Sequence, residues 1–208
     1  MPNEELEVKK FVVGPLLTNS YLVYEKKSLK GALIDPGAYS ADIEEYINEM
    51  KLDMQFILNT HGHADHIAGN SYYKLPVYIH EADELCLRDS DKNLSCFSGE
   101  NIKPQRAEKL LKDGDMIFLG DVELKIISTP GHTPGGICVL SGDILFSGDT
   151  LFFEGVGRAD LPGGNFEALV KSVREKIFTL CDSVKAYPGH GPETTLRHEK
   201  KNNPFVNC

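Results

Sequence analysis

The sequence predicts an α+β fold in which two mixed β-sheets pack face to face and helices cover their outer faces. Its strand-like segments fall into two groups, and each group contains hairpins and is followed by helices. This order favours stacked sheets over an open, doubly wound sheet. No repeat, linker or charge block divides the 208 residues. That length suits one domain with a sizeable core, so we expect a single domain over residues 1–208.

The first group of strands consists of short β-branched and aromatic runs, separated by Gly-Pro, Thr-Asn-Ser and a Lys-rich turn. A helix follows, because apolar residues from Ile43 to Met50 recur at helical spacing. Asp42 lies three residues before Glu45, as in a capping box. The predicted strands are Val8–Val13, Tyr21–Tyr24, Ala32–Ile34 and, after the helix, the buried Phe56–Leu58.

The second group contains two hairpins, whose turns are Gly120-Asp121 and Ser141-Gly142-Asp143. A polar segment over 89–106 precedes it and reads as a surface loop that borders a site. The predicted elements are the strand Val77–Ile79, a helix over Glu81–Arg88, the hairpin strands Met116–Leu119 with Val122–Ile127 and Ile137–Leu140 with Ile144–Phe146, a helix from Phe166 to Ile177, and a last strand Val184–Tyr187.

Composition excludes several classes of function. The chain has 22 Lys and Arg against 31 Asp and Glu, a formal net charge of −9, which disfavours nucleic acid as a partner. No apolar run is long enough to span a membrane and the acidic start does not resemble a signal peptide, so a cytoplasmic protein without a membrane partner is expected. Five cysteines form no CxxC pair, which disfavours disulfides and thiolate zinc sites. The absence of GxGxxG argues against a dinucleotide-binding fold.

The segment THGHADH is the most informative in the sequence. His61, His63, Asp65 and His66 lie within six residues, directly after the strand that ends at Leu58. Imidazole and carboxylate groups without thiolates suit zinc, manganese or iron in a catalytic site, and one such turn can serve two adjacent metals. The alternative is a cluster of exposed or hydrogen-bonded histidines.

Three more residues lie in loops that follow predicted strands. His132 occurs in STPGHTPGG, Asp149 in FSGDT and His190 in YPGHG. Any one of them alone is more typical of a capping or core residue, but together with THGHADH they indicate one site built from several strand ends. His80 and His198 are interpreted as structural or exposed.

THGHADH, TPGHTPGG, FSGDT and PGHG, in this order, resemble the motifs of the metallo-β-lactamase superfamily over nearly the whole chain. The resemblance implies a four-layer αββα sandwich with two divalent metal ions, for which zinc is favoured and iron or manganese would also fit. Asp35 in LIDPG matches a residue that supports the histidine loop, and capping of local amides is an equally compatible role. The implied ligands are His61, His63 and His132 for the first metal, Asp65, His66 and His190 for the second, and Asp149 bridging both, with Asp65 also catalytic.

Two further segments, GVGRADLPGGN and GHGPETT followed by NPF, are similar to the glyoxalase II branch, the hydroxyacylglutathione hydrolases. Longer members continue into a helical domain that supplies basic residues for glutathione, whereas this chain ends at Cys208. It is therefore similar to the short, single-domain members. Arg158 occupies the place of a glutathione-binding lysine and is the implied substrate-binding residue, but Asp160 replaces the tyrosine that follows in those enzymes.

The implied reaction is hydrolysis of a small thioester by a metal-bridging hydroxide, which needs no Ser or Cys nucleophile. The site keeps a positive local charge, so a small anionic substrate is expected. Two alternatives stay open: a persulfide dioxygenase that binds one iron through positions matching His61, His132 and Asp149, and a non-enzymatic metal-binding protein on the same fold. A β-lactamase proper and an RNA-processing enzyme are disfavoured, and the sequence does not determine the oligomeric state.

Overall fold

Two six-stranded β-sheets form the centre of the structure, a computed structural model that describes residues 5–98 and 102–206. The first sheet has the order β1-β2-β3-β4-β5-β6; β1 to β3 are antiparallel and β3 to β6 parallel. Both the sheet and its mixed character agree with the prediction. Its strands are β1 (Leu6–Val13), β2 (Thr18–Glu25), β3 (Lys30–Ile34), β4 (Asp53–Leu58), β5 (Val77–His80) and β6 (Lys109–Leu111).

The second sheet has the order β14-β13-β10-β9-β8-β7, in which only β10 and β13 pair in parallel. Gly120 and Gly142 adopt positive φ angles in the two predicted hairpin turns, which explains glycine there. A separate small hairpin joins β11 (Leu151–Phe152) to β12 (Gly155–Val156). The strands of the large sheet are β7 (Met116–Leu119), β8 (Val122–Ser128), β9 (Ile137–Ser141), β10 (Ile144–Gly148), β13 (Lys185–Pro188) and β14 (Thr194–Thr195).

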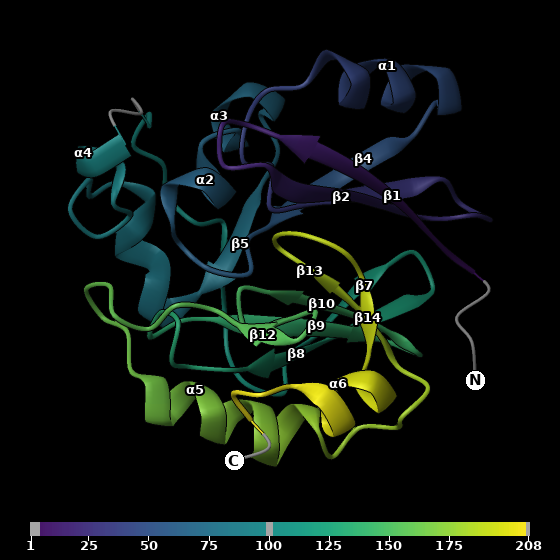
Figure 1. Ribbon diagram of the computed structural model, residues 1–208. Helices are drawn as coiled ribbons and strands as arrows, with labels where there is room; N and C mark the ends of the chain where they lie inside the picture. Colours follow the sequence, from purple (N-terminus) through teal and green to yellow (C-terminus); the bar gives the residue numbers. More distant parts are fainter. Residues whose placement is uncertain (1–4, 99–101, 207–208) are drawn as a thin grey trace.

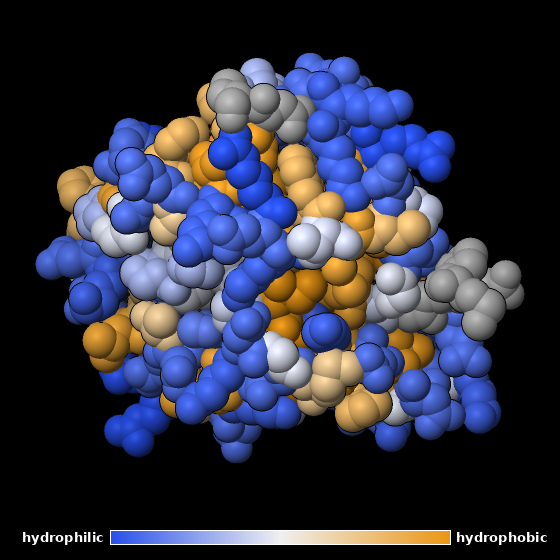
Figure 2. All heavy atoms as spheres, turned by 90° about the horizontal axis from the view of Figure 1, so that it is seen from below, coloured by the Kyte–Doolittle hydropathy of each residue, from blue (hydrophilic) through white to orange (hydrophobic). Residues whose placement is uncertain are grey.

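Helices lie on the outer face of each sheet, so the molecule has four layers (Figure 1). One layer contains α1 (Ala41–Met50). The opposite layer contains α5 (Phe166–Ser172), which continues through the π-helical turn η2 (Val173–Ile177), and α6 (Leu196–Asn202). The face on the side of α5 and α6 is mostly polar, with an apolar area near its centre (Figure 2). The shorter helices are α2 (Ala64–Ile67), α3 (Asn70–Tyr73), the 3₁₀ helix η1 (Glu81–Leu87) and α4 (Ser95–Ser98).

Three apolar clusters hold the layers together. The central one lies between the sheets, where Tyr21 and Phe146 pack with ring centroids 5.3 Å apart. The second lies between the first sheet and α1, and the third between the second sheet and the α5 and α6 layer. Strand β2 is buried along its whole length because its residues alternate between two of these clusters: Tyr21 and Val23 face the central one, and Leu22 and Tyr24 face α1.

Some local predictions were wrong. Helix α1 follows Ser40 and begins at Ala41, and no side chain caps it, so the capping box at Asp42 does not form. The helix predicted over Glu81–Arg88 does form, as the 3₁₀ helix η1. Strand β6 and helices α2, α3 and α6 were not predicted. The predicted 89–106 loop contains α4, and its residues 99–101 lie outside the described part. No described helix is long and apolar enough to cross a membrane.

Candidate metal centre

The predicted site residues meet at one edge of the sandwich. His61 follows β4, while His132, Asp149 and His190 follow β8, β10 and β13. Within the second sheet these three strands run in the same direction, so their carboxyl ends lie at one edge. The two sheets therefore bring together loops that are up to about 130 residues apart in sequence, as the strand-end prediction requires.

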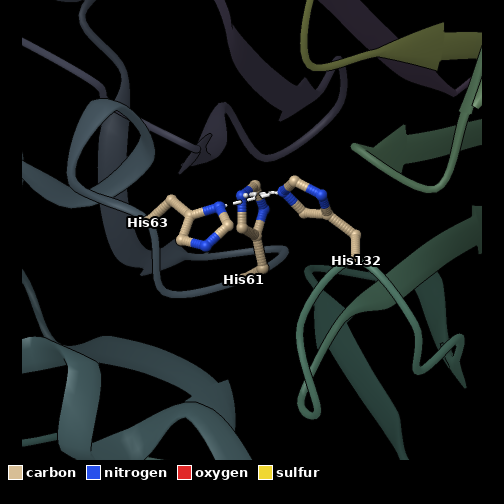
Figure 3. A group of neighbouring side chains, drawn as sticks. All are labelled: His61, His63 and His132. Carbon is tan, nitrogen blue, oxygen red and sulfur yellow. Dashed lines mark hydrogen bonds between the residues drawn. The ribbon is translucent and has the colours of Figure 1, made fainter. Parts of the chain in front are cut away.

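His61, His63 and His132 form the first group, with His61 and His63 on one loop and His132 on a loop of the second sheet (Figure 3). His132 Nε2 lies 2.9 Å from His63 Nδ1 and 3.2 Å from His61 Nε2. A tetrahedral zinc ion about 2.0–2.1 Å from each nitrogen requires the nitrogens to be roughly 3.3 Å apart. The spacing of the ring nitrogens therefore suits a shared cation.

Hydrogen bonds on the far side of the rings determine the tautomers. His132 Nδ1 donates to the Arg158 carbonyl at 2.7 Å, which leaves a lone pair on His132 Nε2. The Thr60 hydroxyl donates to Asp35 and so accepts from His61 Nδ1 at 3.2 Å, which leaves a lone pair on His61 Nε2. Two nitrogen lone pairs thus face each other, an arrangement that a bound cation stabilises.

Two imidazoles of the first group, His61 and His63, are also neutral. Burial, together with the neighbouring imidazoles His66, His132 and His63, holds the pKa of His61 well below its usual range. Burial, together with the neighbouring imidazoles of His132 and His66, lowers the pKa of His63 to about 3. Neutral imidazoles at physiological pH are the form that binds metal.

Asp65, His66 and His190 form the second group. Asp65 Oδ2 lies 3.4 Å from His66 Nε2 and 3.2 Å from His190 Nε2, and the two ring nitrogens are 3.3 Å apart. Burial opposes a charge on His66, but the carboxylates of Asp65, Asp149 and Asp35 outweigh it and raise its pKa to about 10. This surplus of buried negative charge attracts a cation.

Asp149 lies between the two groups. Its Oδ1 is 3.5 Å from His66 Nε2, and its Oδ2 is 3.5 Å from His132 Nε2. Oδ1 is buried, and no described residue forms a hydrogen bond with it. An unpartnered buried carboxylate oxygen is unfavourable unless a cation binds it. The donor set therefore fits divalent metal ions, one in each group, with Asp149 placed to contact both.

The site opens into a cavity of about 540 Å³, within the usual range for small-molecule sites. Histidines and aspartates of both groups form one wall. Arg158 also lines the cavity, and its guanidinium holds both carboxylate oxygens of Asp160 at 2.8 Å. The lining also includes large apolar side chains, those of Leu16, Leu94, Phe152, Val156 and Leu161.

A family model described as the metallo-beta-lactamase superfamily matches residues 13–190. The chain belongs to this superfamily. The "Probable metallo-hydrolase YqgX" of Bacillus subtilis is 36% identical, and the match covers 96% of this chain and 97% of the relative. The "Hydroxyacylglutathione hydrolase GloC" of Haemophilus influenzae is 32% identical, with 91% and 92% covered. The superfamily predicted from the four motifs is confirmed.

Solved structures of the superfamily resemble the whole sandwich. A "BLEG-1 B3 metallo-beta-lactamase" superimposes with a TM-score of 0.90 at 31% identity, covering 97% of this chain and all of that one. "TTHA1623 in a di-iron-bound form" has a TM-score of 0.83 at 34% identity, with 95% and 100% covered. "ETHE1 from Myxococcus xanthus" has a TM-score of 0.82 at 27% identity, with 97% and 85% covered. These similarities confirm the predicted αββα fold.

Asp35 supports the histidine loop of this superfamily member, one of the two roles considered for it. Its carboxylate accepts from Thr60 N at 2.7 Å and Thr60 Oγ1 at 2.6 Å. It also accepts from His66 Nδ1 at 3.0 Å, which leaves His66 Nε2 free to face the second group. Asp35 is buried with a φ of 49°, at the turn after β3. Its partners Thr60 and His66 lie at least 25 residues away in sequence, so Asp35 does more than cap local backbone amides.

Asp83 was missed by sequence reasoning. This buried carboxylate accepts hydrogen bonds from Gly62 N at 2.9 Å, Thr133 Oγ1 at 2.7 Å and Gly135 N at 2.7 Å. It therefore joins the loop that carries His61 and His63 to the loop that carries His132. Close packing explains Gly62, because a Cβ there would lie 2.3 Å from Cys86 Cβ.

Strand β2 of the first sheet holds the His190 loop, a second feature that the sequence does not reveal. Asn19 N donates to the Gly189 carbonyl at 2.7 Å, and Asn19 Nδ2 donates to the carbonyls of Pro188 and Gly191 at 2.9 Å. Tyr21 OH also donates to Pro188 at 2.7 Å. His80 and His198 lie outside the centre, as predicted: His80 caps η1, and His198 pairs with Glu154 at 2.9 Å.

Proposed function

We propose that this chain is a metal-dependent hydrolase of small thioesters with a dinuclear site. The observation that carries the proposal is Asp149, which lines the cavity between the two groups of ligand atoms and whose buried Oδ1 accepts no hydrogen bond from any described residue. The 32% identity with a hydroxyacylglutathione hydrolase over 91% of the chain supports the thioester as the substrate. Zinc is the proposed native metal. Iron is the alternative, because the similar protein TTHA1623 has been solved in a di-iron-bound form.

The proposed ligands are His61, His63 and His132 for one ion and Asp65, His66 and His190 for the other, with Asp149 shared. Such ions supply an activated water at neutral pH and polarise a carbonyl group. The reaction consumes one water: a bond forms between its oxygen and the acyl carbon, the carbon–sulfur bond breaks, and the acid and the thiol leave. No Ser or Cys nucleophile is required.

Asp65 is the proposed catalytic residue among the ligands. Burial opposes its charge, but His66 and His190 outweigh this effect and hold its pKa well below its usual range. Asp65 therefore stays ionised. Thr18 Oγ1 donates to Asp65 Oδ2 at 3.2 Å and fixes the direction of the carboxylate, which lines the cavity. Its role is to accept a hydrogen bond from the attacking water and orient it toward the acyl carbon.

Metal content and substrate turnover test the proposal together. Protein purified without added metal is expected to contain about two divalent ions per chain and to hydrolyse thioesters faster than lactams, phosphodiesters or persulfides. Elemental analysis and a screen of these four substrate classes provide the measurement. Bound metal without turnover of any class would instead indicate a non-enzymatic metal-binding protein.

A persulfide dioxygenase is the second candidate, and the segment Gly157-Arg158-Ala159-Asp160, with its ion pair, is the observation that favours it. Such an enzyme needs one iron, through His61, His132 and Asp149. One iron per chain and oxygen uptake with glutathione persulfide would establish it and exclude the thioesterase.

Arg158 is the proposed binding residue for an anionic end of the substrate. Its guanidinium is engaged by Asp160, and both side chains are mostly exposed, so solvent screens the ion pair and an anionic substrate can compete with Asp160. Asp160→Asn is therefore expected to lower KM about threefold for a thioester with a free carboxylate and to leave KM for a neutral thioester unchanged. Steady-state kinetics with the two substrates measure the effect, and a parallel change for both would contradict it.

A further inference from the structure

One part of the cavity lining, the apolar wall, is built from side chains of separate segments. Leu16 lies in the turn between β1 and β2, Leu94 precedes α4, Phe152 and Val156 belong to β11 and β12, and Leu161 lies in the loop before α5. Leu16 is 60% exposed to solvent. These residues present an apolar surface directly beside the site of hydrolysis, and an apolar ligand would cover it.

Besides the proposed metal ligands, two polar side chains line the cavity, Asn93 and Arg158, and both already have partners. Asn93 Nδ2 donates to the Cys86 carbonyl at 2.7 Å, and Asn93 Oδ1 accepts from Ser95 N at 2.9 Å. Arg158 is paired with Asp160 at the rim. A hydroxyl group on an acyl chain that lies against the apolar residues would therefore lose its hydrogen bonds to water without regaining them there.

We propose that this cavity selects thioesters whose acyl group is an apolar chain of several carbons, in preference to short or hydroxylated acyl groups. The inference rests on the proposed thioester hydrolysis. In this arrangement the acyl chain lies against Leu16, Leu94 and Leu161, and the carbonyl carbon faces the metal groups. Water adds to that carbon, the carbon–sulfur bond breaks, and an apolar carboxylic acid and a thiol are released.

The test uses acyl thioesters of one neutral thiol, N-acetylcysteamine, with the metal-loaded protein. From acetyl through butyryl to hexanoyl, kcat/KM is expected to rise about threefold for each methylene, the gain typical of burying a CH₂ group. The lactoyl thioester is expected to be hydrolysed more slowly than the propionyl thioester. A flat series, or faster turnover of lactoyl than propionyl, would overturn the inference and leave thioester hydrolysis intact.

Two adjacent leucines offer a matched pair of variants. Leu16 lines the cavity, whereas Leu17 is 65% exposed and is not among the described residues that line it. Leu16→Ser is expected to lower kcat/KM for the hexanoyl thioester about fivefold, and so to reduce the ratio of hexanoyl to acetyl turnover. Leu17→Ser is expected to change neither. Because both side chains are largely exposed, both variants are expected to fold.

Binding of the acid product separates this inference from the proposed function. Hexanoate is expected to bind more tightly than acetate by calorimetry, and Leu16→Ser is expected to remove most of that difference. If no thioester is hydrolysed but hexanoate still binds preferentially, the proposed function fails and the apolar selectivity stands. Equal affinities for hexanoate and acetate would overturn the selectivity, whatever the enzyme hydrolyses.

Discussion

Replacing His61 or Asp149 with alanine is expected to remove bound metal and thioester hydrolysis together. His61 presents a lone pair to the first group, and Asp149 lies between both groups. The His61→Ala protein should lose mainly the first ion and the Asp149→Ala protein both. Because metal ions supply several kcal/mol of transition-state stabilisation, kcat/KM should fall about 1,000-fold or more. Elemental analysis and steady-state kinetics measure the two effects.

His198→Ala is the matched control for this prediction. His198 pairs with Glu154 and belongs to neither group of ligand atoms, so both metal content and turnover should stay normal. Asp149 Oδ1 accepts no hydrogen bond from any described residue. Chelator-treated Asp149→Ala protein should therefore melt within a few degrees of chelator-treated wild type, which distinguishes ligand loss from misfolding. Full metal occupancy with normal turnover in either variant would refute the assignment.

The second large effect is expected at Asp83. Asp83→Ala removes the carboxylate that accepts hydrogen bonds from Gly62 N, Gly135 N and the Thr133 hydroxyl, and these three donors stay buried. We expect the free energy of unfolding of the metal-free protein to fall by about 2–4 kcal/mol, since each unsatisfied buried donor costs about 1–3 kcal/mol and removal of a buried charge offsets part of the loss. Urea denaturation measures this change.

The same substitution should weaken metal binding at the first group. Asp83 connects the loop of His61 and His63 to the loop of His132, and supporting residues of this kind typically contribute 10- to 100-fold to metal affinity. Competition with a chelator gives the affinity. Thr133→Val removes one of the three hydrogen bonds and should show a smaller effect of the same sign. Wild-type stability and affinity in the Asp83→Ala protein would show that the two loops do not depend on this carboxylate.

Much of the fold follows from local patterns. Hairpins with Gly120 and Gly142 formed as predicted, because a positive φ angle is a local requirement that glycine meets at no steric cost. Strand β6 was missed because it is a three-residue edge strand with two exposed residues, too short to show an alternating pattern. The capping box failed because α1 begins one residue before Asp42, and helix ends are poorly specified by short motifs.

The sequence by itself determined the superfamily and the seven residues that converge at the sheet edge, because ligand-bearing loops after strands are recognisable from short motifs. Tertiary structure alone decided how those residues are held. Asp83 reaches Thr133 and Gly135 about 50 residues away, and Asn19 reaches the His190 loop about 170 residues away. Hydrogen bonds over such separations leave no periodic or local trace in the sequence. They form only because packing of the two sheets brings opposite halves of the chain into contact.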